Sequence, residues 1–211
     1  MRSITLLIGI IFVGTTTLFA QPGFHCPGTG SGKLVKARNG NTSRKELDAR
    51  EQSLNMHKNR VTSPNAFNSF INMQTMLDSK DDSIFSADDG AKVEGYLFRI
   101  VPGNKESCNC FTADKTQYNI TLFLSPSPIN DSTTTAKCLA VEITPYSRQL
   151  HSEWTTQYIT AHFLKKHVIV KGWLLYDYLS KPESVASNPG KPGMKRHTVW
   201  EIYPVTEMIL E

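Results

Sequence analysis

Trp200-Glu201-Ile202-Tyr203-Pro204-Val205 lies in the last of five strand-like stretches in the chain. The stretches cover residues 92–101, 117–124, 138–144, 167–176 and 199–210. Residues 117–124 alternate most clearly, with Tyr118, Ile120, Leu122 and Leu124 on one side, which is the period of a half-buried strand. Between the third and fourth stretches, residues 149–166 place Leu150, Trp154, Tyr158, Ile159 and Phe163 at helical spacing. We therefore predict three strands, one helix and two strands.

This order is typical of the OB-fold, a five-stranded Greek-key barrel that more often binds a ligand than converts one. The sequence thus predicts a mainly β protein with helices, whose barrel occupies residues 91–211. The helix is expected to plug one end of the barrel. Residues 180–197 form a long loop rich in Pro and Gly between the last two strands. In an OB-fold this loop is one wall of the ligand groove.

The first twenty residues have the pattern of a signal peptide. Arg2 supplies a positive start, 4–13 is an apolar run, and Leu18-Phe19-Ala20 ends on a small residue before Gln21. We predict cleavage after residue 20 and export to the periplasm or the outside, with no membrane span afterwards. The alternative is an uncleaved N-terminal anchor.

Residues 21–90 are predicted to be an N-terminal extension with one or two helices. Ser43-Arg44-Lys45-Glu46 has the form of a capping box and predicts a helix that runs to residue 58. Ser63-Pro64 predicts the start of a second helix. The apolar face expected there consists of Phe67, Phe70, Ile71 and Leu77.

The four cysteines are Cys26, Cys108, Cys110 and Cys138, and export would place them where disulfides persist. Three pairings are possible, and the sequence does not choose among them. Bonds from Cys108 and Cys110 to Cys138 and Cys26 would tie the barrel to itself and to the extension. A metal site is the alternative, but Cys-x-Cys lacks the two-residue gap common in structural zinc sites. We expect disulfides, no metal and no cofactor.

Six short blocks resemble a family of exported bacterial OB-fold proteins that is largely uncharacterised and described as nucleic-acid-binding-like. The blocks occur in order at residues 54–60, 93–96, 106–110, 141–145, 170–174 and 200–205. In this family the last block more often has His where this chain has Tyr203. The resemblance implies the barrel and a binding role, but it implies no particular ligand.

Aromatic and basic residues supply the candidate binding site. Trp173 and Tyr96 could stack on bases or sugar rings, although a Trp in a small barrel is more often part of the core. Lys195, Arg196 and His197 in the long loop could contact phosphates, or could solvate a mobile loop. The candidate ligand-binding residues are Trp173, Lys171, Tyr96, Lys195, Arg196, His197 and Glu201. In the N-terminal arm, basic residues also outnumber acids, which is a pattern of polyanion-binding or surface-binding tails; they are Lys33, Lys36, Arg38, Arg44, Lys45 and Arg50.

Glu94, Glu142 and Glu201 lie on three different predicted strands. Two of them on one face could form a general acid/base pair or a site for a hard metal. The alternative is that each faces outward or pairs across the sheet with Lys171 or Arg99. The chain contains no Gly-x-Ser-x-Gly, no His-Glu-x-x-His and no phosphate-binding Gly-rich loop with its Lys-Ser/Thr.

The net charge of +4 falls to +3 without Arg2, which is mild for a dedicated duplex-DNA binder. We therefore expect a non-catalytic exported module that binds an anionic or oligomeric ligand, single-stranded nucleic acid or a glycan, on its barrel face. A protein-interaction or structural domain is the alternative. A hydrolase using Glu142 and Glu201 is the third hypothesis.

Overall fold

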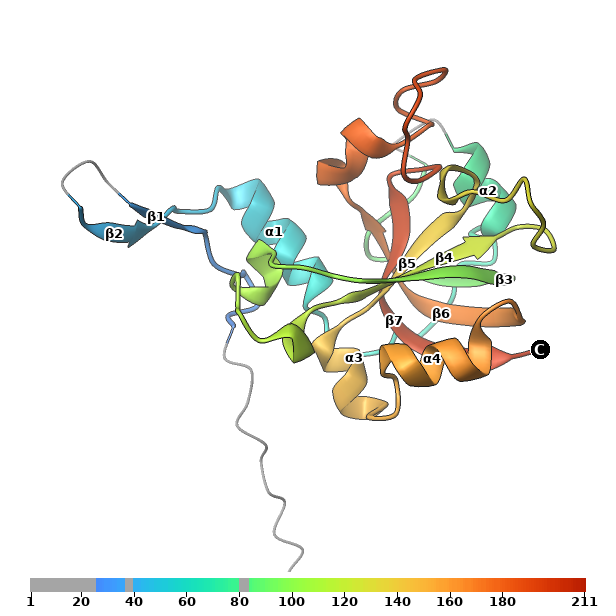
Figure 1. Cartoon of the computed structure of the whole chain (residues 1–211), viewed down its shortest axis with the longest axis horizontal. Helices are drawn as coiled ribbons and strands as arrows, with labels where there is room; N and C mark the ends of the chain where they lie inside the picture. The colour runs from blue at the N-terminus through green and yellow to red at the C-terminus, as the bar shows by residue number, and fades with distance from the viewer. Residues whose placement is uncertain (1–25, 37–39, 80–83) are drawn as a thin grey trace, which may run out of the picture.

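The computed structural model describes residues 26–36, 40–79 and 84–211 of the chain. The signal peptide predicted for residues 1–20 lies outside these ranges. Within them, the protein is mainly β with a few helices (Figure 1). No helix in these ranges is long and apolar enough to cross a membrane.

Five strands form a closed barrel, as the alternating stretches predict. They are β3 (Gly90–Pro102), β4 (Ile120–Ser125), β5 (Leu139–Ile143), β6 (His167–Tyr176) and β7 (Trp200–Leu210). The order around the barrel is β3-β4-β5-β7-β6, in which β5 and β7 are parallel and every other pair is antiparallel. The long β3 closes the barrel because its Tyr96 pairs with Ser125 on one side and with His167 on the other.

Alternation along β7 separates the core from the outer face. Trp200 and Ile202 belong to the buried core, whereas Glu201 and Tyr203 lie on the outer face of the barrel. The alternation is interrupted after the cis Tyr203–Pro204 bond, and Val205 belongs to the core again. The register between β6 and β7 shifts on either side of Gly172. A Cβ at Gly172 would lie 2.2 Å from the Pro204 carbonyl oxygen, so only glycine allows this close approach.

The single helix predicted over residues 149–166 is wrong, because the structure has two. These are α3 (Pro145–Leu150) and α4 (Thr156–Phe163), each with its own threonine N-cap, Thr144 and Thr155. Leu150 is 68% exposed and therefore does not share the buried face of Ile159 and Phe163. Both helices lie at one end of the barrel (Figure 1).

The helix starts predicted in the extension are also wrong. Ser43 belongs to β2 (Thr42–Arg44), which pairs with β1 (Leu34–Lys36) in a separate two-stranded ribbon. The first helix, α1 (Ala49–Lys58), begins after Asp48, whose side chain accepts a hydrogen bond from the Glu51 amide. The second, α2 (Met73–Asp78), begins after Asn72, which forms a reciprocal capping box with Thr75.

This later start changes the predicted apolar face of the second helix. Phe67 and Phe70 precede α2 and are 39% and 56% exposed, whereas Ile71 and Leu77 are buried. In the part of the chain that the structure describes, the connections contain four short 3-10 turns: η1 (Ser107–Asn109), η2 (Lys115–Gln117), η3 (Thr135–Lys137) and η4 (Tyr178–Glu183).

Candidate functional site

A polar groove with a cavity of about 520 Å³ lies on the outer face of the barrel. Thr121 and Phe123 of β4, Glu142 of β5 and Tyr203 of β7 contribute to its lining. Its other lining residues include Lys58 of α1, Glu106 of the β3–β4 connection, and Asp177, Glu183, Lys195 and Arg196 of the long β6–β7 connection.

Strand register explains why these side chains meet. Val141 pairs with Ile202 in the parallel β5–β7 ladder, so the next residues, Glu142 and Tyr203, are also neighbours on the outer face. Thr121 pairs with Glu142 across β4 and β5, and its hydroxyl donates a 2.7 Å hydrogen bond to Glu142 Oε1. Three strands thus bring one acid and two hydroxyls together.

Lys58 is a buried cation at one side of the groove. Its Nζ lies 3.2 Å from Asp177 Oδ2 and 3.7 Å from Glu106 Oε2, and it is 5.1 Å from the centre of the Tyr203 ring. Burial by itself would lower the pKa of Lys58, but Asp177 and Glu106 outweigh it and raise this pKa well above its usual value. Lys58 therefore remains charged, and its charge is neutralised within the protein.

Arg196 and Glu201 form a second buried pair, with Arg196 Nη2 donating to Glu201 Oε2 at 2.7 Å. Their side chains are only 9% and 1% exposed. Burial raises the pKa of Glu201 to about 7, although Arg196 acts in the opposite direction. Arg196 Nη1 and Glu201 Oε1 have no hydrogen-bond partner within the described residues. This pair therefore has a free donor and a free acceptor, which buried groups seldom leave unused.

Glu142 faces outward from its strand, as predicted, but it is buried rather than solvent-exposed. Burial raises its pKa to about 8, and the nearby Glu201 and Glu106 add to this effect. At neutral pH the carboxyl is therefore largely protonated and can donate a hydrogen bond as well as accept one.

The floor of the groove continues into a buried cluster around Cys108. Asn119 Nδ2 donates to the Tyr203 hydroxyl, and Cys108 Sγ lies 3.6 Å from the same oxygen. Burial raises the pKa of the Cys108 thiol to about 12, so this thiol is not an activated nucleophile.

One disulfide joins Cys26 to Cys110, which ties the extension to the barrel as one of the open pairings would. The companion bond between Cys108 and Cys138 is absent, and both are buried free thiols. They are apart because Cys138 packs against Phe123 and Ala140, whereas Cys108 contacts Tyr203.

The structure separates the predicted ligand-binding residues into two groups. Lys195 and Arg196 line the groove, and Glu201 lies beneath Arg196. His197 follows them, but its Nδ1 lies 3.0 Å from the Ala136 carbonyl oxygen, outside the groove lining. Only part of the predicted set therefore converges.

Trp173, Lys171 and Tyr96 lie elsewhere, along the paired strands β3 and β6. The Arg60 guanidinium covers the Trp173 ring at 4.5 Å, and Trp173 Nε1 donates to the Thr62 carbonyl. Lys171 pairs with Glu207 at 2.9 Å, and the Tyr96 ring contacts His167. These residues do not form the open stacking platform that the sequence suggested.

Sequence reasoning missed Lys58, Asp177, Glu106 and Thr121 as members of the groove. Lys58 and Glu106 do occur in two of the six recurring blocks, which was the available signal. Their convergence depends on α1 and the β3–β4 connection packing at the same place, which no local pattern reveals.

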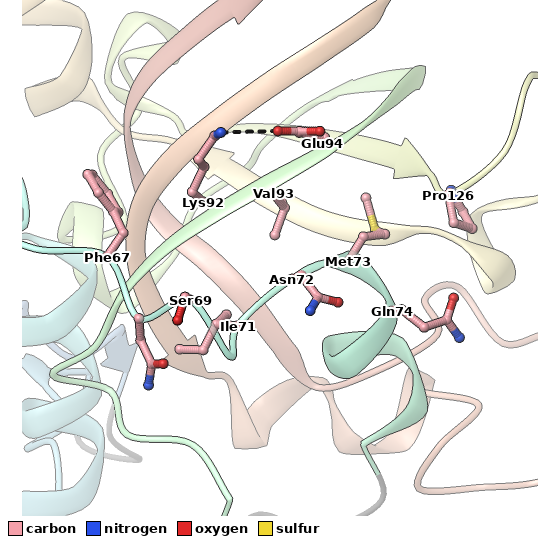
Figure 2. A pocket seen from close by; sticks show the side chains of 11 residues that line it. Phe67, Ser69, Ile71, Asn72, Met73, Gln74, Lys92, Val93, Glu94 and Pro126 are labelled. Carbon is pink, nitrogen blue, oxygen red and sulfur yellow. Dashed lines mark ion pairs between the residues drawn. The ribbon is translucent and has the colours of Figure 1, made fainter.

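A second cavity of about 620 Å³ lies between α2 and β3 (Figure 2). Lys92 and Glu94, which pair with each other at 3.1 Å, contribute to its lining, and Ile71, Met73 and Val93 supply apolar lining. None of the unpartnered buried side-chain atoms found in the described chain belongs to this cavity. The groove around Glu142 and Arg196 is therefore the stronger candidate site.

Across the described ranges, no group of three or more His, Cys, Asp or Glu side chains is placed to hold a metal ion. The chain matches no protein-family model, no curated protein and no solved structure.

Proposed function

We propose that the protein is an exported OB-fold module that binds a hydroxyl-rich oligomeric ligand, a glycan, in the groove around Glu142 and Arg196. The observation that carries this proposal is the polar cavity of about 520 Å³ between two connecting segments on the outer face of β4 and β5. In OB-folds, oligosaccharides and oligonucleotides bind on that face, between the loops that join strands one to two and four to five.

The strand order supports the OB-fold assignment. The parallel contact between the third and fifth barrel strands, with β3 closing against both β4 and β6, agrees with the expected topology. The Cys26–Cys110 disulfide is compatible with export, as is the signal-peptide pattern of the first twenty residues.

The charge state of the groove favours a glycan over nucleic acid. The two buried cations, Lys58 and Arg196, are already paired with Asp177, Glu106 and Glu201. A phosphate entering the groove would also approach the carboxylates of Glu106, Asp177 and Glu183. Sugar hydroxyls instead suit a lining that offers donors and acceptors side by side, such as protonated Glu142 together with the exposed Arg99, Asn104 and Lys195.

The test is titration of the oxidised protein, residues 21–211, with neutral oligosaccharides of about four to six sugars by calorimetry, a length that suits a groove of this class. We expect saturable binding that Arg99→Ala and Asn104→Ala weaken, because both residues are exposed on the rim of the groove. Lys166→Ala, an exposed cation outside the groove, is the matched control. Binding that both rim variants leave unchanged would place the ligand elsewhere.

Carboxylate-dependent hydrolysis is the second candidate, and the raised pKa values of Glu142 and Glu201 favour it. A neutral carboxyl can act as a general acid, and one hydrogen-bonded to a hydroxyl is already oriented. Glu142→Gln separates the two functions. If the protein is a hydrolase, the unmodified protein should release shorter sugars and Glu142→Gln should abolish this release. If the unmodified protein binds the oligosaccharide but does not cleave it, the protein is a binding module.

A further inference from the structure

The ribbon of β1 and β2 projects from the molecule beyond α1, away from the barrel (Figure 1). Every described residue from Lys33 to Lys45 is exposed. A two-stranded ribbon that buries nothing is at best marginally stable in water, so its presence calls for a physical explanation.

The base of the ribbon is held tightly. The Lys45 amide donates to the Lys33 carbonyl at 2.9 Å, and a Cβ at Gly32 would lie only 1.5 Å from the Lys45 carbonyl oxygen. The segment that leads into β1 is tied to the body by the Cys26–Cys110 disulfide and by the 2.9 Å hydrogen bond from the Ser31 amide to the Ser107 carbonyl. The ribbon is therefore a positioned projection rather than a loose tail.

Its charge is entirely positive. Residues 26–45 contain no Asp and no Glu. Lys33, Lys36 and Lys45 have no carboxylate partner in the described chain, and the Arg44 guanidinium donates only to the Gly32 carbonyl. The mild net charge of the whole chain thus conceals a local concentration of unpaired cations.

The cations occupy both faces of the ribbon. Arg44 pairs with Leu34, and Lys36 pairs with Thr42, which places Lys36 and Arg44 on one face. By the same alternation Lys33 and Lys45 lie on the other face, together with Val35 and Ser43.

We propose that this ribbon is a second binding element, whose ligand is double-helical nucleic acid. The major groove of B-DNA is about 12 Å wide and admits a two-stranded ribbon, with phosphates on both sides of it. A ribbon with cations on both faces matches that arrangement. Thr42 and Ser43 supply one short hydroxyl side chain on each face of the ribbon, which can accept a hydrogen bond from a base or donate one to it.

Other anionic partners fit less well. A membrane is planar and would contact one face, yet the exposed apolar residues Leu34 and Val35 are neighbours on a strand and point to opposite faces. Single-stranded nucleic acid is usually held by stacking on aromatic rings, and β1 and β2 contain none. The ribbon also lies apart from the barrel groove, so this proposal does not depend on the glycan proposal.

The experiment measures fluorescence anisotropy of a labelled duplex of about 20 base pairs at 50 and 200 mM salt, with the oxidised protein, residues 21–211. Four phosphate contacts predict a log–log salt slope of about −3.6, which is a loss of affinity of about 150-fold over this range. The variant Lys33→Gln, Lys36→Gln, Arg44→Gln, Lys45→Gln is expected to weaken binding at 50 mM salt by about tenfold or more and to flatten the slope.

The control removes the same four charges from exposed positions of the barrel domain, with Lys115→Gln, Lys137→Gln, Lys166→Gln and Lys191→Gln. It should bind as the unmodified protein does, and circular dichroism checks that both variants melt alike. Equal weakening by both variants would show unspecific attraction and overturn the proposal. Failure to bind duplex, binding of single strands just as tightly, or binding only to vesicles of anionic phospholipid would also overturn it.

Discussion

Arg196 and Glu201 are only five residues apart in the chain, and their side chains meet in a buried 2.7 Å ion pair beside the groove. The turn from the long loop into β7 lies between them, so the pair holds the loop against the barrel. Each partner keeps one atom without a hydrogen bond within the described residues. The pair is therefore a structural contact beneath the groove, with Arg196 in the groove lining and Glu201 buried behind it.

Removing one partner of this pair should cost more than removing both. Arg196→Met leaves Glu201 buried without its cation, and we expect a loss of about 3–5 kcal/mol in the free energy of unfolding. Arg196→Met combined with Glu201→Leu should recover most of this loss, because no uncompensated charge remains. Urea denaturation of both variants measures the difference. Equal losses would mean that packing rather than charge dominates.

Lys58→Met should destabilise the protein for a related reason. Asp177 would remain 7% exposed without its partner at 3.2 Å, at an expected cost of about 3–5 kcal/mol. Lys166→Met, at an exposed position, should change stability by less than about 0.5 kcal/mol. Thermal and urea unfolding of the two variants provide the comparison. A similar small effect at both positions would show that Lys58 is not coupled to the groove acids.

Stability should fall as pH rises from about 4.5 to 8. The pKa values of Glu142 and Glu201 rise from 4.5 in the unfolded chain to about 8 and about 7 in the fold. A pKa that is higher in the folded state than in the unfolded state means that the fold prefers the protonated acid. The stabilisation from protonation is therefore complete below the pKa of the unfolded chain, and it is lost as pH rises through the pKa of the folded protein. Urea midpoints at pH 5, 6, 7 and 8 test this trend.

Glu142→Gln is the control for that pH dependence. The amide mimics the protonated acid and does not ionise, so the variant should show a shallower decline between pH 5 and 8. Asp177 acts in the opposite sense. Burial by itself would raise the pKa of Asp177, but the positive charges of Lys58 and Arg196 outweigh burial and lower this pKa. Its contribution is lost only as pH falls through the lowered value, below the window examined. An unchanged decline in Glu142→Gln would assign the effect to other groups.

Reduction of the Cys26–Cys110 disulfide should loosen the extension. The bond closes a loop with a sequence separation of 84 residues, and its loss should cost about 2–4 kcal/mol. Amide hydrogen exchange should become faster at residues 28–31 and 106–110. In the oxidised protein these two segments are joined by hydrogen bonds among Ser31, Ser107 and Asn55. A double variant, Cys26→Ser with Cys110→Ser, removes the disulfide without the use of a reductant and tests the same expectation.

Thiol labelling gives an independent check of the same pairing. Cys108 and Cys138 are buried free thiols, so both should react slowly with a thiol reagent in the oxidised native protein. In the oxidised protein unfolded by denaturant, two thiols should react rapidly. Peptide mapping should then find the Cys26–Cys110 link intact. A Cys108–Cys138 link instead would contradict the structure at this point.

The barrel was predictable because strand alternation is a local property. Ile120, Leu122 and Leu124 are buried as their spacing predicts, and β6 has the bounds expected for it. The helix boundaries were harder to predict, because several side chains within a few residues can each act as the N-cap. Asp48 and Asn72 cap α1 and α2, whereas Ser43, which has the residues of a capping box around it, pairs in a strand.

The sequence by itself determined the periodicity of the strands, the supply of cysteines and the absence of acids from residues 26–45. These follow from the order of residues and need no long-range contact. The tertiary structure alone decided which cysteines pair, that Trp173 is covered by Arg60, and that Lys58 meets Asp177 across 119 positions of the chain. Barrel closure brings such residues together, and burial then sets their charge, so neither could be read from neighbours in the sequence.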